Sequence, residues 1–443
     1  MLAGMADRPR VVILGAGFAG SYVARHLGKR HEQVDVTLID PRNYVLYTPL
    51  LPEAASGTVE PRHAVVPVRL MCPHASLLLG NAVAVDTESR SVSVETIAAE
   101  RVDVEYDSLV IALGAISRTA DVPGLVEHGV GFKTLGEAIH LRNHVLEELE
   151  LASAVTDPGD RARHLSFVFV GGGYAGVEAL AELEDLVADA IGRYPQLRRL
   201  PRRWVLVEAA GRILAELPPS LAGYAMRQLE LRGIEVRLNT TLSEVDADGA
   251  TLSTGEHIST GTVVWTAGVR PNPLLAGIGV GLDDHGRVEV DGRLRVAGRR
   301  DMWALGDAAA VPNPATPGRV DPPTCQHALR QARRLAANLL ASLDGAPERT
   351  YRYKMMGQVA TLGQHKGVAE VLGLRVRGWP GWWLTRTYHL YQLPLPSRKL
   401  RVVSDWTVGL FFRRDVVELG SLGRETHLPP PPRAGSDHRP PGT

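Results

Sequence analysis

Two glycine-rich segments, about 155 residues apart, constrain the fold of this 443-residue chain more than any other feature. The first is Gly15-Ala16-Gly17-Phe18-Ala19-Gly20, and the second is Gly171-Gly172-Gly173-Tyr174-Ala175-Gly176. Each follows a short apolar run and precedes a segment with helical spacing of apolar residues. Near-continuous apolar strands are typical of parallel sheets that are covered on both faces. The sequence therefore predicts two copies of one strand–turn–helix unit in an α/β protein.

The three glycines of the first segment have separate physical tasks. The first permits a tight turn, the second lets the backbone approach a pyrophosphate, and the third lets the helix pack on the strand. The start of the helix then offers unpaired N–H groups to the phosphates. Asp40 ends the next predicted strand, 34–40, and lies 20 residues after Gly20, a position suited to hydrogen bonds with a ribose. This combination indicates a bound dinucleotide.

In the second copy the corresponding acid is Glu208, which lies in the predicted strand 204–210. It follows Gly176 by 32 residues because an Arg- and Pro-rich insertion, 193–203, precedes the strand. A carboxylate here binds a ribose 2′-hydroxyl and repels a 2′-phosphate, so we expect NADH rather than NADPH. Arg212 lies close by in the sequence and would soften that preference.

Two dinucleotide units need two nucleotides, and one of these has to be redox-active for the pair to make sense. FAD in the first unit and NADH in the second is the simplest arrangement, in which hydride transfer depends on alignment more than on acid–base catalysis. Asp307, in the segment 302–310, suits a carboxylate that binds flavin ribityl hydroxyls, and the alternative is a turn aspartate. Glu178 has two interpretations. It is either a first-turn carboxylate stabilised by the helix dipole, or a residue that faces the nicotinamide ribose or the flavin.

Composition argues against several other classes of protein. Lys+Arg and Asp+Glu both number 49, so no net charge favours nucleic acid. Cys72 and Cys325 provide neither a metal-ligand spacing nor the cysteine pair of disulfide or sulfide:quinone reductases, and they suit a reducing, cytosolic compartment. The first residues lack an apolar core, so we expect no secretory signal, and no stretch approaches the ~18–20 consecutive apolar residues of a membrane-spanning helix.

The two glycine segments, followed in order by IALGA (111–115), WTAGV (265–269) and ALGDAA (304–309), resemble the two-dinucleotide flavoprotein reductases. More narrowly, the segments 43–57, 322–332 and 351–373 resemble the type II NADH dehydrogenases, which are single-subunit NADH:quinone oxidoreductases. The resemblance covers about 10–419. It implies two Rossmann-like dinucleotide-binding domains and a C-terminal α+β extension. The expected divisions are a discontinuous FAD domain (9–125 and 285–345), an inserted NADH domain (126–284), a C-terminal domain (346–425) and a disordered tail (426–443).

Motifs and resemblance together predict the residues that hold the cofactors and carry the reaction. The expected catalytic residues are Glu178, Gln326, Arg330 and Lys354. The resemblance places Gln326, His327 and Ala328 against the flavin, near the quinone entrance. The expected cofactor-binding residues are Gly15, Ala16, Gly17, Phe18, Ala19, Gly20, Asp40, Pro49, Ala112, Gly114, Gly171, Gly173, Tyr174, Ala175, Gly176, Glu178, Glu208, Ala267, Gly268, Gly306, Asp307, Gln326, His327 and Ala328.

The chain departs from the family's AQxAxQ quinone motif at two positions, with Cys325 for Ala and Arg330 for the second Gln. A cationic Arg beside a quinone carbonyl polarises it, but a hydrogen-bonding amide is lost. Lys354 has two interpretations, a cation near the flavin pyrimidine or a solvated surface lysine. The departures keep two rivals open: a soluble NADH-dependent flavoprotein reductase of a ferredoxin- or rubredoxin-like acceptor, and a flavin-bound NADH-sensing or NADH-binding protein.

The segment 375–414 holds eight Lys/Arg, one acid and four of the seven tryptophans. Helices are predicted at 382–393 and about 400–412. Basic, Trp-containing amphipathic helices are typical of anchors on anionic membrane surfaces. The alternative is a helix pair packed on its own domain or on a dimer mate. We therefore expect NADH oxidation through FAD to a membrane quinone without proton pumping. The expected protein is cytoplasmic and lies on the inner face of the cell membrane, with a homodimer as one option for its assembly. The apolar stripe of the second helix would comprise Leu400, Val403, Thr407, Leu410 and Phe411.

Overall fold

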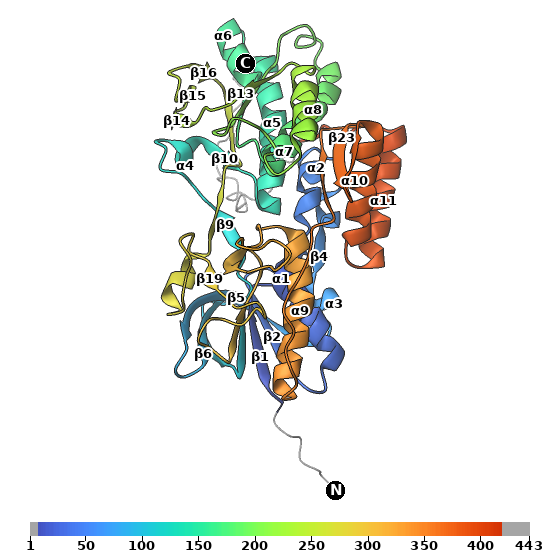
Figure 1. The fold of residues 1–443 in the computed structure, drawn as a ribbon. Coiled ribbons are helices and arrows are strands. Elements are labelled where there is room, and N and C mark those ends of the chain that lie inside the picture. The colour runs from blue at the N-terminus through green and yellow to red at the C-terminus, as the bar shows by residue number, and fades with distance from the viewer. Residues whose placement is uncertain (1–7, 419–443) are drawn as a thin grey trace, which may run out of the picture.

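Two sheets form the frame of the molecule in the computed structural model, which describes residues 8–418 (Figure 1). The larger sheet has the strand order β20-β8-β1-β2-β5-β6-β7. Its first five strands run parallel, and the last two continue it as an antiparallel meander. The strands are β1 (Arg10–Leu14), β2 (Asp35–Asp40), β5 (Ala75–Asp86), β6 (Ser91–Thr96), β7 (Arg101–Glu105), β8 (Ser108–Ile111) and β20 (Met302–Ala304).

The second sheet is parallel throughout, in the order β10-β17-β11-β12-β13. A small antiparallel sheet, β14-β15-β16, lies beside it. The strands are β10 (Gly129–Gly131), β11 (Ser166–Val170), β12 (Arg203–Val207), β13 (Ile234–Arg237), β14 (Leu242–Val245), β15 (Gly249–Leu252), β16 (His257–Ser259) and β17 (Thr262–Trp265). The helices of this lobe are α4 (Leu125–His128), α5 (Leu135–Ala154), α6 (Pro158–His164), α7 (Tyr174–Ala190) and α8 (Pro219–Glu230).

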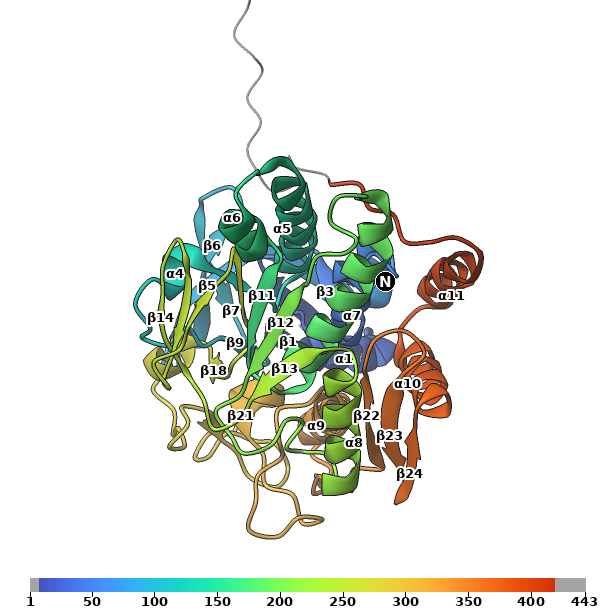
Figure 2. The same ribbon diagram turned by 90° about the horizontal axis from the view of Figure 1, so that it is seen from above.

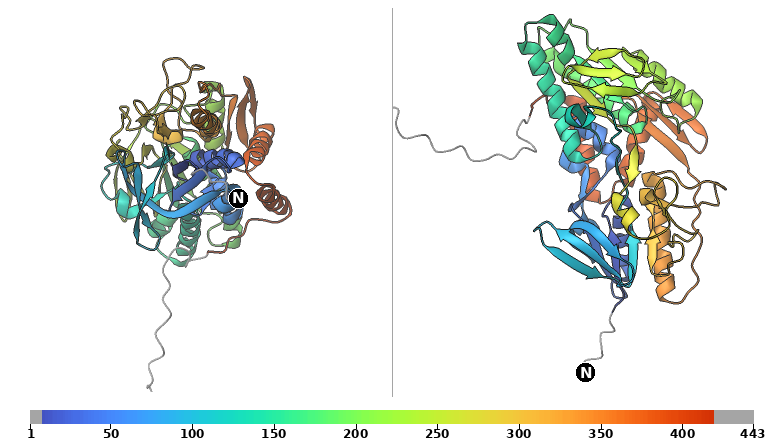
Figure 3. Two further views of the ribbon diagram at one scale, coloured as in Figure 1. Left: turned by 90° about the horizontal axis from the view of Figure 1, so that it is seen from below. Right: turned by 90° about the vertical axis from the view of Figure 1, so that its left-hand side faces the viewer.

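Two short strands join the lobes. The chain leaves the first sheet through β9 (Ala115–Ser117) and returns through β18 (Val269–Pro271), and these strands pair in antiparallel fashion. Figure 3 shows the two lobes from two further sides. β20 belongs to the first sheet although it follows all strands of the second sheet in the sequence. The predicted α/β fold, in which one unit is inserted into another, discontinuous unit, is therefore confirmed. The domain limits given above stay predictions.

A third unit follows α9 (Cys325–Leu343), the helix that packs against α1 (Phe18–Leu27). It contains an antiparallel sheet and the helices α10 (Trp379–Gln392) and α11 (Pro396–Phe411), with α11 at the outer edge of the molecule (Figure 2). Its strands are β22 (Gly357–Thr361), β23 (Gly367–Val371) and β24 (Leu374–Arg377). The remaining elements are β3 (Tyr44–Leu46), α2 (Leu51–Ala55), β4 (Val65–Pro67), α3 (Val68–Met71), β19 (Val288–Glu289) and β21 (Ala309–Ala310).

The predicted elements form close to their expected limits. α9 begins at Cys325, directly after two prolines and Thr324, which caps the helix by accepting a hydrogen bond from the His327 N–H. Among the helices of residues 8–418, none is long and apolar enough to span a bilayer. The predicted tail 426–443 lies outside the described residues.

Candidate functional site

The first glycine loop lies between the end of β1 and the start of α1. Gly15 has φ +96°, a left-handed conformation that favours glycine. A Cβ on Gly20 would stand 1.9 Å from the Gly15 carbonyl oxygen, so only glycine allows this close packing. A Cβ on Gly17 would meet no atom within 4 Å, so this part of the loop faces open space. The Ala16 N–H donates to Asp40 Oδ2 at 2.8 Å, which fixes the loop to the end of β2.

Strand register brings other predicted residues to the same edge. Leu14 pairs with Ile111, which in turn pairs with Ala304, so β1, β8 and β20 end together. The segments that follow carry Ala112, Gly114, Gly306 and Asp307. A Cβ on Gly306 would stand 3.1 Å from the Ala19 Cβ and 3.9 Å from the Ala328 Cβ, so these three predicted residues meet. Pro49 lies in a single 3-10 turn, Thr48–Leu50, that leads into α2.

Asp307 is a largely buried carboxylate at this edge. Among residues 8–418, no donor forms a hydrogen bond with it. Burial raises the pKa of Asp307, and the nearby Lys133 and Arg287 partly oppose that shift. Lys133, from the loop between β10 and α5, is a residue that the sequence analysis missed. The unpartnered carboxylate suits a ligand with hydroxyl groups.

The second glycine loop repeats this backbone design. Gly171 has φ +115°, and a Cβ on Gly176 would stand 1.9 Å from the Gly171 carbonyl oxygen. A Cβ on Gly173 would meet open space, as at Gly17. Glu208 Oε2 accepts the Gly172 N–H at 2.6 Å, and its other oxygen accepts the Ala210 N–H at 2.7 Å. The acid predicted from the spacing therefore holds the loop, despite the 32-residue gap.

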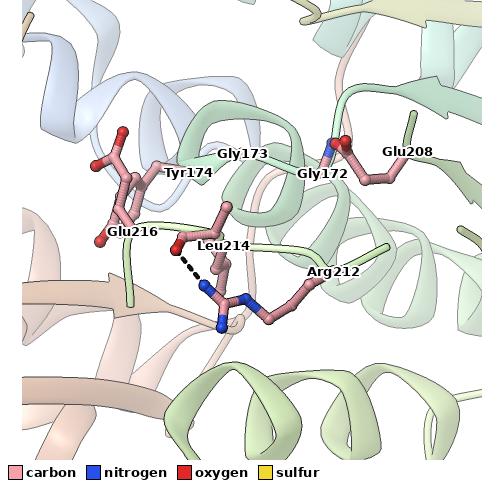
Figure 4. Close-up of a pocket in the computed structure, with 8 residues that line it drawn as sticks. Gly172, Gly173, Tyr174, Glu208, Arg212, Leu214 and Glu216 are labelled. Atoms are coloured by element: carbon pink, nitrogen blue, oxygen red, sulfur yellow. Dashed lines mark hydrogen bonds between the residues drawn. The ribbon is translucent and has the colours of Figure 1, made fainter. Parts of the chain in front are cut away.

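A cavity opens beside this second loop (Figure 4). Arg212 lies in it and donates to the Ala215 carbonyl, so a cation and the Glu208 carboxylate share one space. Ala267 and Gly268 follow β17 at the same edge, because Val170 pairs with Trp265. The lining residues are Gly172, Gly173, Tyr174, Glu208, Arg212, Leu214, Ala215 and Glu216.

Glu178 is the fifth residue of α7, so the expected first-turn position is wrong. A carboxylate there lies beyond the free N–H groups of the helix start. Its Oε1 accepts the Thr361 N–H at 2.8 Å and the Thr361 hydroxyl at 3.3 Å. Burial raises the pKa of Glu178 to about 8, a shift that the Thr361 hydrogen bonds only partly oppose. This shift favours the protonated carboxyl of Glu178 at neutral pH.

One strand of the C-terminal sheet, β22, contacts both motifs. The Gly357 carbonyl accepts from Gln326 Nε2 at 3.2 Å, which ties β22 to α9. Thr361, at the other end of β22, holds Glu178 of α7. Between them, Gln358 accepts from the Tyr174 hydroxyl at 3.4 Å. The segment that resembles the family's quinone motif and the helix α7 after the second glycine loop are thus joined through the five residues of β22.

The amide of Gln326 is engaged on both sides. Its Nε2 donates to Gly357, and its Oε1 accepts the Tyr353 hydroxyl at 3.1 Å. The guanidinium carbon of Arg330 lies 4.9 Å from the Tyr353 ring centroid, a cation–π contact. The motif and Tyr353 therefore form one cluster.

His327 and Lys354 differ from the other motif residues. His327 is buried, with Nδ1 at 2.8 Å from the Thr324 hydroxyl and Nε2 at 3.5 Å from Asp321 Oδ1, so its ring nitrogens face the protein interior. Burial lowers the pKa of His327. Lys354 is exposed, which favours the solvated-lysine interpretation.

With this geometry in place, comparison with known proteins assigns the family. Residues 9–332 match the pyridine nucleotide-disulphide oxidoreductase family. A probable NADH dehydrogenase of Dictyostelium discoideum is 31% identical over 418 residues, which cover 93% of this chain and 91% of that protein. A type II NADH:quinone oxidoreductase of Mycobacterium tuberculosis is 31% identical, with 92% and 88% covered. The chain belongs to the type II NADH dehydrogenases.

A solved structure extends the likeness to the fold. The structure of NDH2 from Plasmodium falciparum in complex with NADH matches with a TM-score of 0.85 at 20% identity, and the match covers 93% of this chain and 100% of that one. As a type II NADH dehydrogenase, the chain is an oxidoreductase. The expected cofactors, FAD and a pyridine nucleotide, are those of its family.

The residues of this type II NADH dehydrogenase fit those cofactors. The open face of Gly17 leaves room for a pyrophosphate, and the unpartnered Asp307 carboxylate suits ribityl hydroxyls. The cavity beside Glu208 suits an adenosine ribose in the same way. Both cysteines are free thiols: Cys72 is buried, and Cys325 opens α9.

A buried network of carboxylates also escaped the sequence analysis. Glu182, one turn after Glu178 on α7, accepts from Arg414 at 3.1 Å and from the Ser56 hydroxyl at 2.9 Å. Glu53 of α2 accepts from Arg386 at 3.1 Å and from the Trp406 indole at 2.6 Å. Because these groups come from three distant parts of the chain, no local sequence pattern predicts that they meet. They connect α10 and α11 to the segment 43–57.

Proposed function

We propose that this type II NADH dehydrogenase oxidises NADH at the second glycine loop and reduces a membrane quinone through FAD at the first. The balanced reaction is NADH + H⁺ + quinone → NAD⁺ + quinol, with no proton pumped. The flavin supplies two-electron exchange when bound. The observation that carries the proposal is the strand β22, because it ties Gln326 of the acceptor motif to Glu178 beside the second loop.

The chain's own groups would bind, orient and hold protons. Asp40 and Glu208 fix their glycine loops and would bind the two riboses. Glu208 would also disfavour a 2′-phosphate, so the second loop would prefer NADH. Glu178 would hold a proton on Oε2, since both of its hydrogen bonds from described residues go to Oε1. The contacts of the other expected cofactor-binding residues with FAD and NADH stay predictions.

The C-terminal helices would hold the protein on the anionic inner face of the cell membrane. Val402 and Trp406 of α11 face its own protein, where the Trp406 indole donates to Glu53. The opposite side leaves large apolar groups exposed, such as Leu400 at 69% and Phe411 at 78%. Packing on its own domain therefore accounts for one side of α11 only. Trp379 and Trp383 of α10 are exposed as well, and the mixture of Trp, aliphatic and basic residues favours a lipid interface. Cytoplasmic location and a homodimer stay predictions.

Anaerobic stopped-flow spectroscopy on the purified flavoprotein tests the proposal. NADH is mixed first, and a neutral short-chain quinone second, while the visible absorption band of the flavin is followed. Rapid bleaching and rapid recovery are expected. Bleaching with no faster recovery than in buffer would overturn quinone reduction and favour a ferredoxin- or rubredoxin-like acceptor. No bleaching by NADH would favour the sensing or binding role.

A further inference from the structure

Aromatic side chains lie near the start of α9, where the Tyr353 hydroxyl donates to Gln326 and its ring contacts Arg330. Tyr22 of α1, Tyr47 after β3 and Tyr388 of α10 all lie close enough to Cys325 for their ionisable groups to interact. The Tyr47 ring lies 5.6 Å from that of Phe18 in the first glycine loop. We call Tyr47, Cys325, Arg330, Tyr353 and Tyr388 the acceptor cluster. Under the proposed function, on which this inference rests, the cluster lies between the flavin site and the C-terminal helices.

Arg330 is the cation of the acceptor cluster, and its charge is not neutralised. It is half-buried, and its guanidinium lies over the Tyr353 ring. Its Nη1 donates to the Gln326 carbonyl at 3.3 Å, a long bond to a neutral group. Within residues 8–418, no carboxylate forms an ion pair with it. Most of its five N–H donors are thus available to a ligand.

The other charges near the cluster do not compensate Arg330. Cys325 stays a neutral thiol, because burial raises its pKa to about 11. Burial also raises the pKa of Tyr388, so its hydroxyl stays neutral. Asp307 acts on Cys325, but Lys133 and Arg287 are the cations that act on Asp307 itself. The buried carboxylate of Asp321 also lies near the cluster, but it accepts hydrogen bonds from Asn313 and Gln331 and lies 3.5 Å from His327 Nε2. A half-buried guanidinium without an ion-pair partner attracts an anion.

The Gln326 amide shares only part of this work. Its Oε1 accepts from Tyr353, and Nε2 gives one of its two N–H groups to Gly357. A guanidinium presents a planar fork that binds an anionic oxygen pair through two parallel hydrogen bonds, which an amide cannot do. Arg330 therefore changes the kind of acceptor that fits, as well as replacing a lost hydrogen bond.

We propose that Arg330 makes the acceptor site selective for quinones that carry an anionic group, such as a carboxylate, a sulfonate or an ionised hydroxyl, next to the quinone ring. The neutral aromatic side chains of the acceptor cluster would contact the ring, and the guanidinium fork would bind the anionic group. Neutral quinones would still react, with weaker binding.

Binding of redox-inert analogues to the FAD-loaded protein tests this without turnover. The probes are naphthalene-2-sulfonate and the neutral naphthalene-2-carboxamide, measured by titration calorimetry at low salt. The wild-type protein is expected to bind the sulfonate about tenfold more tightly or better, the effect of charge-assisted hydrogen bonds. Arg330→Gln abolishes this preference, whereas Arg333→Gln, an exposed position of the same helix, keeps it. Equal binding of both probes, or a preference that survives Arg330→Gln, would overturn the proposal.

Two further readouts distinguish this proposal from a role of Arg330 at the flavin and from a failure of the proposed function. If Arg330→Gln does not retain flavin, Arg330→Lys replaces it, since it keeps the charge and loses the fork; it is expected to keep only part of the preference. In turnover, Arg330→Gln is expected to raise the KM for 1,4-naphthoquinone-2-sulfonate about tenfold more than the KM for 1,4-naphthoquinone, whereas Arg333→Gln leaves the ratio of the two KM values as in the wild type. An altered flavin spectrum or potential with intact sulfonate preference would assign Arg330 to the flavin instead. Rapid recovery with neutral quinones but no anion preference would reject this inference alone, whereas no recovery with any quinone would reject the proposed function.

Discussion

The two glycine loops share one backbone design and differ in what surrounds them. In both, the third glycine would place a Cβ 1.9 Å from the carbonyl oxygen of the first. Asp40, at the first loop, is 5% exposed, and α9 covers the neighbouring α1. Glu208, at the second loop, borders an open cavity. The shared motif therefore suits a phosphate at both sites, and we expect the covered site to hold a resident cofactor and the open site to exchange a substrate.

The largest effect is expected from an alanine at the third glycine of each loop. Gly20→Ala would force α1 away from β1 and abolish flavin binding, because the added Cβ meets a backbone oxygen. Gly176→Ala would leave the flavin bound and weaken NADH binding by at least about a hundredfold. Flavin content and the NADH dependence of flavin reduction measure the two outcomes. Gly277→Ala, where a Cβ meets no atom, is the control. Equal loss of flavin in both variants would contradict the comparison.

The second prediction concerns pH and the second loop. Because burial raises the pKa of Glu178 to about 8, its carboxyl loses its proton as the pH rises through that value. If its proton supports the reaction, the rate falls about tenfold by about pH 9. Glu178→Gln cannot ionise and is expected to flatten this alkaline limb. The free energy of unfolding of the wild type should fall as the pH rises from about 4.5 to 8, because the unfolded chain releases the Glu178 proton in this interval and the folded chain keeps it. In Glu178→Gln this fall should be smaller.

Thr361→Val sharpens the test of Glu178. The Thr361 hydroxyl bonds to the carboxylate and lowers its pKa, so its removal should move the alkaline midpoint upward by a fraction of a unit. Rates measured from about pH 6 to 10 give both midpoints. An unchanged alkaline limb in Glu178→Gln would assign that limb to another group.

The third prediction concerns the carboxylates that hold the two loops, Glu208 and Asp40, each replaced by its amide. Glu208→Gln is expected to raise the KM for NADH about tenfold and to narrow the preference over NADPH, because a charged acceptor of two backbone N–H groups is lost. Asp40→Asn is expected to lower flavin retention by a similar factor and to leave the KM for NADH unchanged. Steady-state kinetics and flavin release measure the pair. Crossed effects, with each variant altering the other nucleotide, would show that the sites are not independent.

Sequence reasoning captured what local pattern encodes and missed what distant segments supply. The glycine spacing, Asp40 and Glu208 were predictable, since each depends on a strand and the turn after it. The partner of Glu178 was not, because Thr361 lies 183 residues away on another sheet. Nor was Lys133 beside Asp307, which approaches the first site from the second lobe. The departure at Arg330 was visible in the sequence, but its lack of a carboxylate partner became apparent only in three dimensions.

The smallest expected effect concerns the membrane, and it is confined to the first loop and to quinone reduction. Glu53 links the segment near the first loop to α10 and α11 through Arg386 and Trp406, so lipid contact should act on quinone reduction and not on NADH oxidation. Arg401→Gln, on the exposed side of α11, is expected to weaken binding to anionic vesicles about fivefold, since a basic residue near such a surface contributes about 1 kcal/mol. Arg101→Gln on the distant β7 is the control. Vesicle sedimentation measures binding, and stopped-flow with vesicles separates the two phases. A lipid effect on flavin reduction by NADH would mean that the helices also act on the second loop, through Glu182 and its bond to Arg414.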